Sequence, residues 1–525
     1  MATSRWTEEL LAKARMEGDP YADGLAEKVM SGEEGVRRYN HLLELADTLL
    51  ATPSLVLNRK SALRQHLEDF SPEALEYFEP DRVPDWVDED KLAVAAQLWK
   101  DNSIAAIGVL YAYSLPCAYT YKDGVPTLYD TGKLAETRYI FQRIYETGIF
   151  ADAVMDPDGI EIMEDFVPRT DGDEGSSRRT QPQRYMWGRG FLAARKVRFL
   201  HASIRCMLTM WRSREGKAPA GDHDPHAGAS WKDGSGKPPI TQKELALVLL
   251  TFGHLIPEGL ERWGAVVSQE QKDAFLHLWR LVGHIMGIND DYTTDDWDEA
   301  RALMEAILEK EAAPSPMGEK LTVALMSFLR EYLPHLPAGL RDRIPAELII
   351  SQLGKLNPAY PPMILPASTY EGTRRLLPRI AFGALMLWVR IYYGVRDRIM
   401  GRIPLIGDTL LSTLHQAAEE LVASWRGEFK RRPFDVSRRI EWKPGEKNPK
   451  LMTWRRRIFN NVAFAVLLLF LAVVGLLGAV VTAFAPVAAS VPEWLLGGSV
   501  VSGVLAWIVM SWRLPRVFAK RPKAA

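Results

Sequence analysis

One helical stretch of the sequence, RKVRFLHASIRCML at residues 195–208, combines a histidine with two arginines. At about 100° per residue, His201 falls in an apolar stripe, and Arg198 and Arg205 lie within a turn's width of it. A guanidinium buried without an anion costs several kcal/mol, roughly speaking, so this face needs negative partners. The stretch itself supplies none.

Two kinds of anion satisfy this requirement. A haem would bring an iron that binds the imidazole of His201, a flat apolar ring, and two propionates for Arg198 and Arg205. A buried Asp or Glu from another helix would serve the arginines equally well. The residues alone leave both alternatives open.

A second helix, predicted over residues 133–154, carries further polar side chains. Arg143, Glu146 and Thr147 stand at positions i, i+3 and i+4, and therefore share one face. Glu146 could act as a general base or pair with Arg143. Thr147 could hydrogen-bond a ligand or only satisfy a backbone carbonyl.

Other constellations are weaker. The motif HDPH at residues 223–226 has metal-like spacing but stands in a polar stretch without an obvious third ligand. His277 and His284 lie on a helix that is apolar nearly all round, which favours core packing. Glu-x-x-His pairs, GxSxG and Walker A motifs are absent from the sequence.

The composition excludes several classes of function. The 525 residues are 47% hydrophobic, with 65 Lys and Arg against 66 Asp and Glu, so no overall basic field attracts nucleic acid. Two cysteines, Cys117 and Cys206, provide neither a disulfide framework nor a thiolate metal cluster. We therefore expect no nucleic-acid partner.

Helical patterns dominate the chain, and strand alternation is scarcely visible, so the predicted fold class is all-α. Residues 1–80 predict an N-terminal helical segment, and residues 81–370 a cofactor-binding catalytic domain. The polar stretches 165–188 and 216–239 predict excursion loops. The apolar run at residues 103–121 predicts a buried helix that ends at Pro116.

The C-terminal part indicates a membrane setting. Residues 371–460 predict basic amphipathic, membrane-proximal helices, and the basic pattern from Arg374 fits a core helix with a solvated edge as well as a helix that rests on the membrane. Residues 461–525 predict a transmembrane hairpin with a short basic tail. The uncharged runs 462–484 and 494–512 are long enough to cross about 30 Å of hydrocarbon at 1.5 Å per residue. Arginines and lysines flank the outer ends of both runs, which predicts an integral membrane protein with both termini and the catalytic domain cytoplasmic.

Several of these stretches together resemble a known family. They are VPDWVDEDKL, YSLPCAY, DTGKL, QRIYET, KVRFLHASIR, PPITQKELALVLLTF and LWRLVGHIMGI. Over residues 81–310, they resemble the catalytic domain shared by latex-clearing proteins (rubber oxygenases) and the fungal membrane-bound oxygenase of mycophenolic acid biosynthesis. The resemblance implies a globin-like helical core that binds haem b and directs dioxygen to a carbon–carbon double bond of an isoprenoid chain.

By position, the resemblance makes His201 the proximal iron ligand, with Arg198 and Arg205 as cofactor-binding residues. Arg143, Glu146 and Thr147 would then occupy the distal-side helix as catalytic candidates. Glu146 stands where the latex-clearing pattern has a lysine. We therefore expect a haem-dependent oxygenase for a hydrophobic, lipid-like alkene other than rubber, in contact with membrane lipid. The alternative is a non-catalytic haem-binding or lipid-binding membrane protein.

Overall fold

The structure is a computed structural model. It describes residues 5–32, 34–54, 62–130, 137–164, 183–214, 237–331, 341–373, 376–398, 412–413, 415–417, 419–420, 449–483 and 490–522. The HDPH motif, most of the two polar stretches and much of segment 399–448 lie outside these residues.

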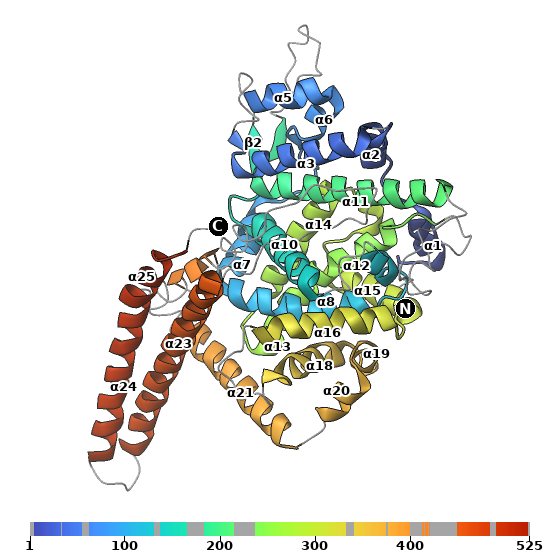
Figure 1. Ribbon diagram of the computed structural model, residues 1–525. Coiled ribbons are helices and arrows are strands. Elements are labelled where there is room, and N and C mark those ends of the chain that lie inside the picture. Colours follow the sequence, from blue (N-terminus) through green and yellow to red (C-terminus); the bar gives the residue numbers. More distant parts are fainter. Residues whose placement is uncertain are drawn as a thin grey trace.

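The described chain is mostly helical, as predicted, with three short strands that the sequence did not predict (Figure 1). Its helices up to the third strand are α1 (Glu8–Met16), α2 (Pro20–Met30), α3 (Gly35–Ala51), α5 (Ala62–Phe70), α6 (Pro72–Tyr77), α7 (Glu89–Val109), α8 (Leu115–Thr120), α9 (Val125–Asp130) and α10 (Thr137–Met155). After it come α11 (Arg189–Arg214), α12 (Gln242–Gly253), α13 (Leu255–Trp263), α14 (Gln269–Ile285), α15 (Trp297–Glu311), α16 (Pro316–Glu331), α18 (Ile344–Leu356), α19 (Pro361–Ile364), α20 (Ala367–Gly372), α21 (Leu376–Arg398), α23 (Pro449–Ala483), α24 (Ser490–Ile508) and α25 (Leu514–Phe518).

The strands form one small antiparallel sheet in the order β1 (Asp81–Arg82), β3 (Arg184–Trp187) and β2 (Glu161–Glu164). Strand β3 ends just before α11 begins, so the last part of the predicted loop 165–188 is a strand. Tyr185, Met186 and Trp187 are buried, whereas Arg184 is half-buried. A four-residue strand is too short to show alternation in a sequence, and the buried apolar side chains explain why it forms.

Two apolar cores stabilise the body. The larger one surrounds α7, α12, α13 and α14, and includes Trp99 and Trp279. The second joins the N-terminal helices to α11, and includes Tyr39, Phe78 and Phe199. Figure 1 shows α2, α3, α5 and α6 as a layer over α11. The N-terminal segment is therefore packed against the rest of the body.

Helix α7 begins at Glu89, because the Asp88 side chain caps it by accepting from the backbone N–H groups of Asp90 and Lys91. The predicted end at Pro116 is wrong. A π-helical turn, η1 (Leu110–Ser114), continues α7 into α8, with Pro116 in the first turn of α8. Proline lacks an N–H, and the first turn of a helix does not need one.

The C-terminal helices α23 and α24 lie along each other and extend away from the body (Figure 1). By length and composition, two described segments could cross a membrane, Glu89–Thr120 and Glu493–Phe518. In the first segment, 78% of the most apolar stretch is buried inside the protein, as in a core helix. In the second segment, 22% of that stretch is buried. Membrane crossing by α23 and α24 stays a prediction.

Candidate functional site

Helix α11 carries the histidine and both arginines of the predicted site. Its start is fixed by a tight backbone approach: Gly188 adopts φ +110°, and the Gly190 N–H donates to Gly159 O at 2.6 Å. A Cβ on Gly190 would lie 2.6 Å from Ala153 O, so only glycine fits there. Apolar side chains such as Phe191 and Phe199 bury one side of the helix.

Arg198 binds a carboxylate of this chain. Its Nε and Nη2 atoms donate to Asp19 at 2.6 and 2.9 Å, and Nη1 donates to Ile285 O at 3.4 Å. The guanidinium also lies over the Tyr21 ring, 5.2 Å from its centroid. Burial alone would lower the pKa of Arg198, but the bonds to Asp19 outweigh it and raise that pKa. The arginine is therefore a fixed cation.

Arg205 has an equivalent partner one helical turn further along α2. Its Nε donates to Asp23 Oδ1 at 2.7 Å, and its Nη1 to Ile240 O at 3.1 Å. Asp23 Oδ2 in turn accepts from the Asp19 backbone N–H at 3.2 Å. Burial raises the pKa of Asp23, and the charge of Arg205 opposes that rise.

These ion pairs answer the charge requirement of α11. The partners are Asp19 and Asp23, the carboxylate alternative that the sequence left open. Asp19 is also the N-cap of α2, ahead of Pro20. A cap is a local feature, whereas the pairing of Asp19 with Arg198 spans 179 residues and leaves no local pattern in the sequence.

His201 lies at the border between the two arginines and a half-buried apolar strip. The strip consists of Val197, Leu200 and Ile204, which follow one side of α11 while Ala202, Ser203 and Arg205 are buried. The His201 imidazole is half-buried and its Nδ1 atom is buried, and a flat apolar group could rest on the strip beside it.

Helix α10 packs against α11 and carries the other predicted residues. Glu146 and Thr147 are half-buried on it. Arg143 belongs to the same helix, but its side chain lies outside the described residues.

The residues around α11 fit a haem in part. A single half-buried imidazole next to apolar side chains suits an axial ligand and a porphyrin face. The arginines do not fit the role of propionate partners as they stand, because Asp19 and Asp23 already hold them. Among the described residues no group of three or more His, Cys, Asp or Glu could hold a bare metal ion, and a haem iron does not require one.

The other two histidines considered from sequence are structural. His277 accepts from the Asp88 N–H at Nε2 and contacts Asp295 through Nδ1 at 2.9 Å. His284 lies 3.3 Å from Asp290. His277 is buried, as core packing predicts, whereas His284 is half-buried and contacts a carboxylate near the surface.

Comparison with known proteins identifies the segment that contains α11. Residues 184–402 match the family described as "ER-bound oxygenase mpaB/B'/Rubber oxygenase, catalytic domain". This segment is therefore similar to that catalytic domain. The catalytic-domain match contains His201, Arg198 and Arg205, but begins after α10. It also continues through α21, beyond the limit of 310 expected from sequence.

The chain is also similar to a curated protein and to a solved structure. A rubber oxygenase from Streptomyces sp. (strain K30) is 29% identical over 155 residues, which is 29% of this chain and 33% of that protein. The chain thus matches about a third of the length of this curated relative. A solved structure of latex clearing protein in the closed state has a TM-score of 0.49 and 21% identity, covering 78% of this chain and 91% of that one.

Proposed function

We propose that this chain is a haem-dependent oxygenase that acts with dioxygen on a hydrophobic alkene of isoprenoid or lipid type. The observation that carries the proposal is the match of residues 184–402 to the oxygenase catalytic domain, with His201 on its long helix. The similarity to a rubber oxygenase supports the oxygen chemistry and the class of substrate. The half-buried apolar strip beside His201 supports a hydrophobic ligand.

In this proposal His201 would hold the iron of haem b. When bound, the haem would supply the activation of dioxygen. Arg198 and Arg205 act as positioning residues, because their pairs with Asp19 and Asp23 hold α11 against α2 and so fix the position of His201 in the folded body.

The side chains of α10 would act on the substrate. The Glu146 carboxylate would accept a proton from an allylic carbon, or pair with Arg143. The Thr147 hydroxyl would donate a hydrogen bond to an oxygen atom of the co-substrate or to a water. Neither role follows from the family match, because both residues precede residue 184.

The proposal places the chain in a membrane. Helices α23 and α24 would cross it, with both termini and the catalytic body on the cytoplasmic side. The exposed side chains of α24 support this, since Trp494 is 79% and Val500 60% exposed. A substrate dissolved in lipid would then reach the body directly from the bilayer.

The test uses the purified full chain in detergent. We expect a haem absorption band that His201→Ala abolishes, with helical circular dichroism unchanged. His41→Ala, at an exposed histidine on α3, is the matched control and keeps the band. With oxygen, a reductant and candidate isoprenoids, mass spectrometry then detects carbonyl products only in chains that bind haem. A haem band without turnover on any lipid class would favour a carrier or sensor, and an unchanged band in His201→Ala would refute the ligand assignment.

A further inference from the structure

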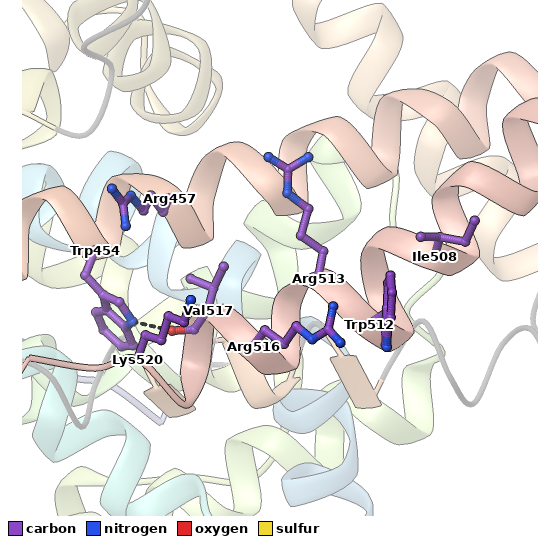
Figure 2. A pocket seen from close by; sticks show the side chains of 8 residues that line it. All are labelled: Trp454, Arg457, Ile508, Trp512, Arg513, Arg516, Val517 and Lys520. Carbon is purple, nitrogen blue, oxygen red and sulfur yellow. Dashed lines mark hydrogen bonds between the residues drawn. The ribbon is translucent and has the colours of Figure 1, made fainter.

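A cavity of about 460 Å³ lies where the C-terminal helices meet, away from α11 (Figure 2). Four cationic side chains and two indoles account for most of its lining, namely Arg457, Arg513, Arg516, Lys520, Trp454 and Trp512. They come from the start of α23 and from the stretch that follows α24. No acidic side chain lines this described cavity.

One wall of the cavity is fixed by packing. The Trp454 Nε1 donates to Val517 O at 2.6 Å, the bond drawn in Figure 2. Trp454 is buried together with Ile458, Leu514 and Phe518 in a small core of its own. The cavity therefore lies between two helices, α23 and α25, that are packed together.

A π-helical turn forms the opposite wall. The turn η4 (Val509–Arg513) stands between α24 and α25, and it carries Trp512 and Arg513. Such turns widen the helix by one residue, change the direction of the side chains that follow, and are frequent at functional sites. The Arg516 guanidinium lies 3.7 Å from the centroid of the Trp512 ring, which orients it.

The cations of this cavity have no carboxylate partner among the described residues. In the described part of the chain, none of Arg457, Arg513, Arg516 and Lys520 forms an ion pair with a carboxylate, whereas Arg198 and Arg205 of the body each have one. Four cationic groups that line one cavity create a positive potential, and their N–H donors match the oxygens of a phosphate group.

Apolar surface leads into the cavity from one side. Val500, Val504 and Ile508 are 60%, 53% and 42% exposed along α24, and Ile508 itself lines the cavity. The 61% exposed Trp512 stands at the boundary between this apolar surface and the cations. Indoles favour such a boundary at the surface of a membrane. The surface thus fits a ligand that combines an anionic head with an apolar tail.

We propose that this cavity binds the phosphate-bearing headgroup of an anionic phospholipid, whose acyl chains lie along the exposed face of α24. The site is independent of the proposed oxygenase chemistry. It requires only that α24 contacts lipid. A soluble phosphate ester carries the same phosphate group without acyl chains. The exposed apolar face of α24 beside the cavity favours the lipid over such an ester.

The test is native mass spectrometry of the full chain in a neutral detergent, titrated with phosphatidylglycerol or with phosphatidylcholine of the same acyl chains. We expect selective retention of phosphatidylglycerol. Arg513→Gln and Arg516→Gln should each weaken it about fivefold, and the double variant about 30-fold, from the usual contribution of one cation near an anionic headgroup. Arg456→Gln is the matched control, because Arg456 is exposed on α23 beside Arg457 but does not line the cavity.

A charge-preserving variant, a folding control and a soluble competitor complete the experiment. The variant Arg513→Lys/Arg516→Lys keeps the charge and should keep most of the retention, and circular dichroism confirms that every variant is folded. Equal retention of both lipids, or an equal loss in Arg456→Gln, would overturn the proposal. Displacement of the lipid by glycerol 3-phosphate at equal concentration would also overturn it, since the site would then take a soluble anion.

Discussion

Arg198 and Asp19 form a two-bond ion pair that ties α11 to the cap of α2. The side chain of Asp19 is 4% exposed and that of Arg198 is 12% exposed. Water therefore stabilises neither charge well, and each is stabilised mainly by the other. Removing one partner of such a buried pair leaves an uncompensated charge, which costs more than the pair contributes. The pair is therefore a sensitive point of the fold.

Asp19→Asn tests this dependence. Asparagine still caps a helix, so the change removes the charge and keeps the cap. We expect a loss of about 3 to 5 kcal/mol in the free energy of unfolding, measured by denaturant titration of the full chain. Asp88→Asn, at the exposed cap of α7, should cost less than about 1 kcal/mol. Equal effects of the two variants would show that Arg198 does not depend on Asp19.

Gly190 and Gly24 offer a contrasting pair of substitutions. Gly190→Ala places a methyl group against Ala153 O and Gly159 O, and should destabilise the protein by about 1 to 3 kcal/mol. Gly24→Ala, inside α2, meets nothing within 4 Å and should stabilise it by about 0.5 to 1 kcal/mol. Thermal melting followed by circular dichroism measures both changes. A neutral Gly190→Ala would mean that the start of α11 has room to shift.

His254 gives the body a dependence on pH. It is fully buried and stacks on Trp297, with ring centroids 3.9 Å apart. Burial, helped by nearby cations such as Arg301, lowers the pKa of His254 to about 3. Because the unfolded chain binds a proton near pH 6.5 and the folded chain does not, stability should fall as the pH falls from about 6.5 towards 3.

The slope from this group is about 1.4 kcal/mol per pH unit once the unfolded side chain is protonated. His254→Phe keeps the ring and removes the proton, so its stability should vary less between pH 6 and 4. His41→Phe, at an exposed histidine, should leave the profile of the parent chain intact. The measurement is denaturant unfolding at several pH values, and parallel profiles for His254→Phe and its parent would exclude this origin.

The orientation of the hairpin is testable with reporters. A reporter fused after Ala525 should be cytoplasmic, and one fused to a chain that ends at Ala483 should be on the opposite side, because only α23 would then cross. Enzymatic activity of a compartment-sensitive reporter measures both. Two reporters on the same side would show that α23 does not span the membrane.

Sequence periodicity was sufficient for the helices and for the grouping of His201 with Arg198 and Arg205, because these features lie within one helical repeat. It could not identify Asp19 or Asp23 as partners, since nothing local shows that a helix cap or an aspartate in the first turn pairs with a distant arginine. Strand β3 was missed because four residues carry no period. The cationic cavity was visible only as clusters of arginine flanking apolar runs, and the π-helical turn that shapes it leaves no recognised pattern.

The layer formed by α2, α3, α5 and α6 has a consequence for any attempt to shorten this protein. Its helices share an apolar core with Phe199 of α11, and its aspartates compensate the charges of that helix. A chain that starts at residue 81 would expose the apolar side of α11 and leave the guanidinium groups of Arg198 and Arg205 without Asp19 and Asp23. We expect such a chain to aggregate. Helices α2, α3, α5 and α6 are therefore part of the same folded body as α11, although the family match begins only at residue 184.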